Sequence, residues 1–175
     1  NKYVGNKKLI LAYDNRLSTP MLKKALLSEI HAHVIDIGMV PTPFFYYAMD
    51  QYKHDYGAMV TASHLSKEFN GFKINHGSWA LTYDTGINVL ERFSKLFNYK
   101  KLKPKITKIK MSKEYYGFIL SKVHKVNKNL KVAVDGGNGI AGPFLVKALK
   151  MKGISALELH TKTDGNFPNH VANPL

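Results

Sequence analysis

Residues 60–73, VTASHLSKEFNGFK, decide the architecture that the sequence predicts. The stretch follows an apolar run, Tyr56–Val60, that is typical of the end of a buried strand. After this run the pattern changes to small and polar residues, and an extended pattern returns at Gly71–Ile74. This order predicts a loop held between two extended segments. Loops on a rigid scaffold are where binding and catalytic residues tend to lie.

Strand and helix patterns alternate on the amino-terminal side of this loop. Short apolar runs predict buried strands, and one-sided apolar spacing between them predicts helices. Ser18 or Thr19 is expected to cap the first helix, with Pro20 in its first turn. The expected strands cover residues 8–13, 34–38 and 55–61. One expected helix follows Pro20, and a second covers residues 44–52. This alternation favours right-handed βαβ units and a parallel sheet, whose ligands collect at the carboxyl ends of its strands.

The carboxyl-terminal side predicts a hairpin, a connector and the start of a second unit. Residues 73–83 are typical of a hairpin in which Trp79 is partly buried, and Asp84–Thr85 can cap a following helix. The lysine-rich segment 99–110 is interpreted as a linker between domains. Beyond it we expect a helix over 111–126, a strand over 131–135, a helix over 143–152 and a strand from 154 to 159.

A glycine-rich turn at residues 136–142 joins the expected strand 131–135 to its helix. Such a turn resembles an anion cradle, because the amino ends of helices attract phosphate. It has neither a Walker sequence nor the dinucleotide-binding spacing, so a tight packing turn is the favoured interpretation. His170 has no partner at metal-ligand spacing and is not expected to bind a metal.

The composition is that of an ordinary globular protein, with 45% hydrophobic and 22% charged residues. The chain has no cysteine, which excludes a disulfide framework and any cysteine-based metal site. No apolar run approaches the ~18 to 20 residues needed to cross a bilayer. Residues 1–8 carry no signal-peptide pattern. We therefore expect a cytoplasmic location and no membrane partner.

The net charge of +14 comes mainly from lysine, and Arg16 and Arg92 are the only arginines. Proteins that read bases or clamp phosphates favour arginine for its bidentate geometry. The lysines concentrate over residues 100–131, where Glu114 is the only acid. We interpret this run as a solvated basic surface around a connector in preference to a nucleic-acid site, because basic clusters alone are weak motifs. A positive field would nevertheless attract sugar phosphates.

The quoted loop carries three side chains that suit group-transfer chemistry. Ser63 offers a hydroxyl nucleophile that needs activation, His64 titrates near neutral pH, and Lys73 can act as acid, base or phosphate anchor. Taken alone, a Ser-His dipeptide in a surface loop usually has no function, because short motifs often match by chance. Likewise, a structural ion pair without a role in function is the alternative interpretation of Asp14 and Arg16 at the end of the first strand.

The whole string is more specific than its parts. TASH followed by EFNGFK resembles the phosphoserine loop of the α-D-phosphohexomutases, the phosphoglucomutase/phosphomannomutase family, whose pattern is TASHNP, a spacer and YNGFK. Four further motifs match the family in the same order: residues 14–20 (DNRLSTP), 40–43 (VPTP), 134–142 (VDGGNGIAG) and 164–170 (DGNFPNH). The resemblance covers the chain from about Ile10 to Leu175.

The resemblance implies that Ser63 is phosphorylated in the working enzyme, that Lys73 assists proton transfer and that His64 lines the site. Three further residues are expected to support these from behind without touching the reacting atoms: Asp14, Arg16 and Asn70. The implied reaction interconverts hexose 1-phosphate and 6-phosphate through a bisphosphorylated sugar. The implied cofactor is Mg²⁺, bound by the phosphate on Ser63 and by three aspartates of a third domain.

The implied fold class is α/β. Residues 1–103 would form a mixed, mostly parallel sheet with flanking helices, the domain that carries the phosphoserine loop, and residues 104–175 would form part of a second, similar α/β domain. The family's metal loop, sugar-reading loop and phosphate-binding loop do not occur in these 175 residues. The isolated chain is therefore expected to be inactive, and the sequence does not identify which hexose phosphate is the substrate.

Leu65 and Ser66 replace the family's Asn-Pro beside the nucleophile. An amide side chain and a stiff residue are lost, so the turn is expected to be less fixed. This departure keeps open a non-catalytic remnant or paralogue that binds a partner or a sugar phosphate. A basic nucleic-acid-binding module is the remaining alternative, and only the lysines favour it.

Overall fold

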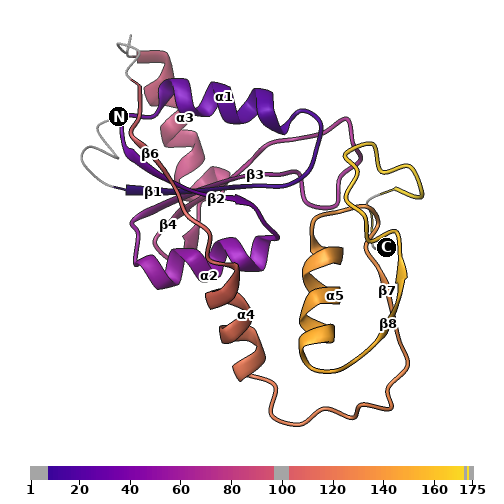
Figure 1. The fold of residues 1–175 in the computed structure, drawn as a ribbon. Helices are drawn as coiled ribbons and strands as arrows, with labels where there is room; N and C mark the ends of the chain where they lie inside the picture. Colours follow the sequence, from indigo (N-terminus) through magenta and orange to yellow (C-terminus); the bar gives the residue numbers. More distant parts are fainter. Residues whose placement is uncertain (1–7, 97–102, 172, 174–175) are drawn as a thin grey trace.

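Six strands form the main sheet of the computed structural model, which describes residues 8–96, 103–171 and 173 (Figure 1). Their order is β5-β4-β3-β1-β2-β6. The parallel strands are β1 (Lys8–Tyr13), β2 (His33–Met39), β3 (Tyr56–Val60) and β6 (Ile106–Lys108), and the antiparallel ones are β4 (Phe72–His76) and β5 (Trp79–Ala80). The predicted mixed, mostly parallel sheet with flanking helices is confirmed.

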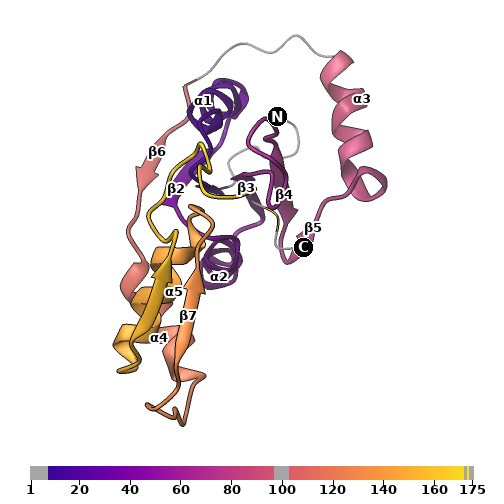
Figure 2. The ribbon, with the colours of Figure 1, turned by 90° about the vertical axis from the view of Figure 1, so that its right-hand side faces the viewer.

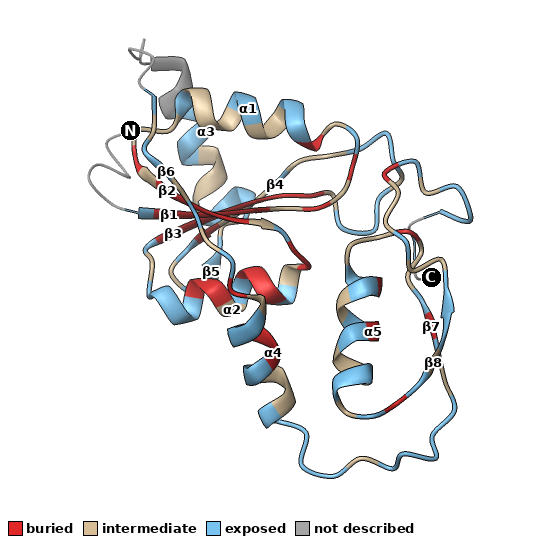
Figure 3. Cartoon of the chain, in the orientation of Figure 1, coloured by how far each residue is buried: buried red, intermediate tan, exposed pale blue. Residues whose placement is uncertain are grey.

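Two helices cover opposite faces of this sheet, and alternate residues of β1 face each of them. Leu9 and Leu11 belong to the core beneath α1 (Thr19–Glu29), whereas Ile10 and Ala12 belong to the core beneath α2 (Thr42–Tyr52). Figure 3 shows the central strands as the most continuously buried part of the molecule. Burial on both faces is the reason that these strands read as unbroken apolar runs.

The start of α1 differs from the expectation. Ser18 precedes the helix but makes no side-chain cap bond. Asn70 Nδ2 donates to the hydroxyl oxygens of both Ser18 and Thr19, at 3.0 Å each, and Thr19 Oγ1 donates to the carboxylate of Asp14 at 3.1 Å. The two candidate cap residues therefore connect loops at the carboxyl edge of the sheet.

The helix after the hairpin also begins differently. A π-helical turn, η1 (Tyr83–Ile87), precedes α3 (Asn88–Leu96), and its cap is Thr82 rather than Asp84–Thr85. The Thr82 hydroxyl accepts from the backbone N–H of Thr85 at 3.3 Å, and the Thr85 hydroxyl accepts from that of Thr82 at 2.8 Å. Trp79 was expected to be partly buried but is 80% exposed, because β5 forms the edge of the sheet.

The expected linker contributes to the first sheet. Residues 99–102 lie outside the described residues, but the rest of segment 99–110 contains β6, which pairs in parallel with β2. The next helix, α4 (Ser112–Ser121), is shorter than the predicted 111–126, and its Tyr115 stacks on Phe44 of α2 with ring centroids 4.3 Å apart. The predicted domain boundary at residues 103/104 stays a prediction. Both β6 and α4 follow this boundary in sequence, yet β6 is a strand of the first sheet and Tyr115 of α4 belongs to the core beneath α2.

The second unit consists of β7 (Val132–Asp135), α5 (Ala141–Met151) and β8 (Ala156–Leu159), with the loops that follow the two strands. β7 and β8 pair in parallel, and α5 packs on them (Figure 2). Phe144 of α5 meets the Phe44 ring edge-on at 5.8 Å and stacks with Tyr116 of α4 at 6.0 Å. These aromatic contacts join the second unit to α2 and α4. Among the described residues, no helix is long and apolar enough to span a bilayer.

Gly57 of β3 gives a test of how closely α2 packs on the sheet. A Cβ at this position would lie 2.5 Å from Met49 Sδ and 2.7 Å from Phe45 Cζ. We expect Gly57→Ala to destabilise the chain by about 1–3 kcal/mol through overpacking. Gly117→Ala is the matched control, because a Cβ there meets nothing within 4 Å and lies on a helix. It should stabilise by about 0.5–1 kcal/mol. The free energy of unfolding of both variants and of wild type is measured by urea denaturation. A Gly57→Ala variant as stable as Gly117→Ala would contradict the close packing of α2 on β3.

Candidate active site

Loops from both units line one cavity of about 650 Å³. On the first unit these loops follow β1, β2 and β3, and on the second they follow β7 and β8, so the cavity lies at the carboxyl ends of both sets of parallel strands. This is the position at which open α/β sheets collect ligands. A cavity of similar size, about 610 Å³, lies away from these loops, between α2 and the β4–β5 hairpin.

Residues 61–71, which we call the serine loop, connect β3 to β4. The loop is closed at its base, where the backbone N–H of Thr61 donates to the carbonyl of Gly71 at 2.9 Å. Thr61 is buried, and its hydroxyl accepts from the backbone N–H of Ser63 at 3.0 Å. Ser63 itself is exposed, lines the cavity and has a left-handed backbone with φ of 56°. The predicted nucleophile therefore faces open space and is not packed inside the protein.

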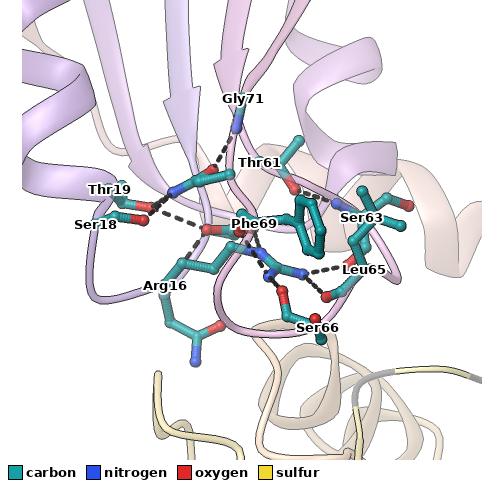
Figure 4. A network of polar contacts seen from close by, with 12 residues as sticks. Arg16, Ser18, Thr19, Thr61, Ser63, Leu65, Ser66, Phe69 and Gly71 are labelled. Atoms are coloured by element: carbon teal, nitrogen blue, oxygen red, sulfur yellow. Dashed lines mark hydrogen bonds and ion pairs between the residues drawn. The ribbon is translucent and has the colours of Figure 1, made fainter.

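Arg16 reaches into the serine loop with its side chain and binds the main chain of the loop (Figure 4). Its side chain is buried, with 1% of its surface exposed, and its guanidinium donates to four main-chain carbonyls. The acceptors and distances are Ser63 (2.9 Å), Leu65 (2.7 Å), Ser66 (2.7 Å) and Phe69 (3.0 Å). The fifth N–H, on Nε, donates to Asp14 Oδ2 at 3.2 Å. All five donors of the guanidinium are thus used.

Asp14 and Asn70 hold Arg16 and the serine loop in place. Asp14 lies beside the start of the loop, where its N–H donates to the carbonyl of Val60, and Asn70 lies near the end of the loop. The Asp14 carboxylate also accepts from the backbone N–H of Arg16 and from the Thr19 hydroxyl, both at 3.1 Å. Asn70 Oδ1 accepts from the backbone N–H of Gly71 at 2.9 Å, while its Nδ2 reaches the start of α1. The three residues expected to support the site lie in one connected network.

His64 and Lys73 lie at different places relative to the cavity. His64 is exposed and lines it beside Ser63. Lys73 lies on β4 directly opposite Met59 of β3, and Met59 lines the cavity, whereas Lys73 is not among the lining residues. Directly opposite residues of antiparallel strands project from the same face of a sheet. The lysine is therefore on the cavity side of the sheet but set back from Ser63.

The replacement of Asn-Pro by Leu65 and Ser66 leaves the turn well held. The backbone N–H of Leu65 donates to the carbonyl of Ala62, and that of Phe69 donates to the carbonyl of Ser66, both at 3.1 Å. Arg16 binds the carbonyls of Leu65 and Ser66, which every residue type carries. The expectation of a less fixed turn is not supported, because main-chain groups fix this turn.

The glycine-rich turn after β7 uses its backbone donors within the second unit. Gly136 N–H donates to the carbonyl of Leu159, Asn138 N–H to that of His160 and Gly139 N–H to that of Gly136, each at 2.8 Å. A Cβ at Gly136 would lie 2.9 Å from the His160 carbonyl oxygen. The favoured packing interpretation fits this geometry, although the turn also lines the cavity.

The second unit contacts Asn15 and Arg16 in the loop after β1, a contact that the sequence analysis did not predict. Asn15 Nδ2 donates to the carbonyl of Asn138 at 2.9 Å, and the Arg16 guanidinium carbon lies 5.4 Å from the centre of the Phe167 ring. A Cβ at Gly165 would lie 2.5 Å from the carbonyl oxygen of Asn15 and 3.0 Å from the amide of Leu17. The motif at 164–170 could be found from sequence, but its contact with the first strand's loop could not.

His170 forms an ion pair with Asp135 across the second unit's part of the cavity, with Nε2 3.1 Å from Oδ1. A hydrogen bond to the Val171 carbonyl and the bond to Asp135 raise the pKa of His170 above its ordinary value of 6.5. The backbone N–H of Gly137 and the His170 ring lower the pKa of Asp135 below its ordinary value of 3.8. The pair is therefore charged over the range between these two ordinary values.

The sign of the pH dependence follows from the two shifts. The raised pKa of His170 contributes stability below pH 6.5 that is lost as the pH rises through that pKa. The lowered pKa of Asp135 contributes stability above pH 3.8 that is lost as the pH falls. We expect Asp135→Asn to lower the pKa of His170, measured by NMR titration of its ring. The difference in stability between the variant and wild type should be largest between pH 3.8 and pH 6.5. An unchanged pKa of His170 would contradict an ion pair with Asp135.

The described residues do not by themselves fit the expected magnesium site. No group of three or more His, Cys, Asp or Glu side chains among them is placed to hold a metal ion. Ser63 offers one oxygen, and Asp14 is engaged by Arg16 and Thr19.

Comparisons with known proteins agree with this geometry. The family model described as phosphoglucomutase/phosphomannomutase, alpha/beta/alpha domain I, matches residues 1–92, and that of domain II matches residues 113–175. A phosphomannomutase/phosphoglucomutase of Pseudomonas syringae is 37% identical over 164 residues, which cover 92% of this chain and 35% of that protein. A phosphoglucomutase of Neisseria gonorrhoeae is 33% identical, over 97% of this chain and 38% of that protein. The chain thus spans little more than a third of these relatives.

Solved structures show the same fold. The crystal structure of a phosphoglucomutase/phosphomannomutase family protein from Burkholderia thailandensis superposes with a TM-score of 0.82 at 32% identity, over 97% of this chain and 39% of that one. A structure titled as a putative phosphomannomutase, from Thermus thermophilus, is 19% identical and shares the fold with a TM-score of 0.80. With family models matching most of its length and the serine motif at the rim of its first sheet, the chain belongs to the phosphoglucomutase/phosphomannomutase family.

Proposed function

We propose that the full-length protein containing this chain is a phosphohexomutase that interconverts hexose 1-phosphate and hexose 6-phosphate. The observation that carries the proposal is Ser63, exposed at the carboxyl edge of the sheet and presented to a 650 Å³ cavity by a loop that buried Arg16 holds. Family membership supports the enzyme class. The proposal includes the cytoplasmic location expected from the sequence.

The proposed reaction consists of two successive phosphoryl transfers, one from Ser63 to the sugar and one from the sugar to Ser63. Phosphorylated Ser63 gives its phosphoryl group to the free hydroxyl of the sugar phosphate: the Oγ–P bond breaks, a sugar O–P bond forms, and the hydroxyl's proton moves to Oγ. The bisphosphorylated sugar then reorients, and its other phosphoryl group returns to Oγ while that sugar oxygen takes the proton. Such a step depends on positioning and charge neutralisation more than on covalent assistance.

Within this scheme we assign roles to three residues of the chain. Ser63 carries the phosphoryl group, His64 contacts the substrate at the cavity wall, and Lys73 assists the proton transfer from the cavity side of the sheet. An ammonium at Lys73 would also offset phosphate charge, and the side chain would have to move toward Ser63 when the phosphate is present. Asp14, Arg16 and Asn70 act through the loop and not on the reacting atoms.

Magnesium belongs to the proposal as the cofactor of the full-length enzyme. A phosphate oxygen on Ser63 would be one ligand, and the remaining ligands would come from outside the described residues. When bound, the ion would offset negative charge on the transferring group.

The serine assignment is tested by phosphate labelling of the full-length protein. Incubation with a ³²P-labelled hexose bisphosphate should label the wild-type protein near one phosphate per chain. Ser63→Ala should abolish the label, because the accepting oxygen is lost. Ser66→Ala is the matched control in the same loop and should keep the label, because Arg16 binds the Ser66 carbonyl and not its hydroxyl. Tandem mass spectrometry locates the phosphate. Label that persists in Ser63→Ala would overturn the serine assignment, and a wild-type protein that takes no label would favour a non-catalytic relative.

The isolated 175-residue chain should show no turnover of glucose 1-phosphate or mannose 1-phosphate above background. The reason is its extent: it spans 35% to 38% of the two relatives named above, so most of the length of such a protein lies outside it. A coupled assay with the full-length protein as positive control measures this. Turnover by the isolated chain would show that the two units suffice.

A further inference from the structure

We propose that Arg16 is the positioning residue of the serine loop and that Phe167 of the second unit holds Arg16 in place, so that the geometry of Ser63 depends on the docking of the second unit. The inference rests on the proposed phosphoryl transfer at Ser63.

The first argument is the burial of the Arg16 charge. A buried guanidinium costs several kcal/mol of desolvation unless its charge and donors are satisfied. Here Asp14 neutralises it, and the other four N–H groups bind carbonyls of Ser63, Leu65, Ser66 and Phe69. These acceptors span seven residues of the loop. Among the described residues, the backbone–backbone hydrogen bonds within the loop are one at its base and one in each of two turns. The guanidinium therefore supplies the bonds that connect the middle of the loop to the sheet.

The second argument is the position of Ser63 within that set. The Ser63 carbonyl accepts from Nη2 at 2.9 Å, and its N–H donates to the Thr61 hydroxyl at 3.0 Å. These two bonds clamp the residue on both sides in the left-handed conformation, φ 56°, which a non-glycine residue adopts only when its surroundings impose it. This backbone fixes where the side chain of Ser63 leaves the loop at the cavity.

The third argument is what covers Arg16 on its far side. The Phe167 ring lies 5.4 Å from the guanidinium carbon, at a distance suited to a cation–π contact. Gly165 allows the close approach, because a Cβ there would meet the Asn15 carbonyl oxygen at 2.5 Å. Asn15 in turn donates to Asn138 of the second unit at 2.9 Å. The Arg16 guanidinium thus contacts the serine loop of the first unit and Phe167 of the second unit, and it connects the two units.

Two substitutions in the full-length protein test the proposal. Arg16→Lys keeps the charge but loses the fork that reaches four carbonyls, and Phe167→Leu keeps an apolar group but removes the aromatic face. The matched controls are Arg92→Lys, an exposed position on α3, and Phe118→Leu, which removes a similar contact of Lys122 with a ring 5.2 Å away on α4.

The first measurement is single-turnover transfer from ³²P-labelled phosphoserine at position 63 to glucose 1-phosphate. Arg16→Lys should lower the rate constant by ~10- to 100-fold with unchanged amplitude, because misplacing a reacting atom by about 1 Å has such an effect. Phe167→Leu should lower it by about 3- to 10-fold. Both controls should match wild type. A purely structural role would reduce the amplitude, the fraction of competent protein, and leave the rate constant unchanged; that result would overturn the proposal.

The second measurement does not need activity. Hydrogen exchange at the amides of Leu65 and Phe69 should accelerate at least about tenfold in Arg16→Lys, and less in Phe167→Leu, while amides of β1 and β3 keep wild-type protection. Unchanged exchange at these amides refutes the positioning role even if the enzyme is active. Absence of phosphate on wild-type Ser63, with exchange accelerated as expected, refutes the proposed function and leaves the positioning of the loop established.

Discussion

A single buried cation, Arg16, organises the edge of the sheet where the chain concentrates its polar residues. Its five N–H groups are all used, one on Asp14 and four on carbonyls of the serine loop. Removing any acceptor would leave a buried charged donor unsatisfied, which is among the more costly defects in a protein interior. The strand β1 places Asp14 and Arg16 at this edge, and β3 delivers the loop beside them, so the packed sheet makes the arrangement possible.

Because Arg16 acts on main-chain carbonyls, the serine loop tolerates change in its side chains. Leu65 is 46% exposed, so its side chain makes little contribution to holding the turn. A sequence comparison scores the loss of Asn-Pro at this point as a departure, whereas the geometry identifies the unchanged part, the carbonyls and their arginine. The physical content of the motif therefore lies partly outside it, fifty residues away in sequence at the end of β1.

The second unit contributes more than a wall of the cavity. The N–H groups of residues 136–139, in the turn after β7, donate to acceptors within the second unit, and these bonds hold the shape of the turn. Through Asn138, Gly165 and Phe167 the second unit meets the loop after β1 at hydrogen-bonding and van der Waals distances. The position of the second unit and the geometry of Ser63 are thereby linked in one contact network.

The βαβ order, the parallel sheet and the candidate residues Ser63, His64 and Lys73 could be predicted from the sequence. These follow from local patterns, since apolar runs, turn residues and short motifs are readable without knowing what lies opposite. Three features became visible only in the folded chain. The expected linker contributes β6, Ser18 and Thr19 bind Asn70 in place of capping α1, and the Arg16 guanidinium binds four carbonyls beside the Phe167 ring. Each of these depends on partners 47 or more residues apart, and nothing in the sequence marks which donor a backbone carbonyl will meet.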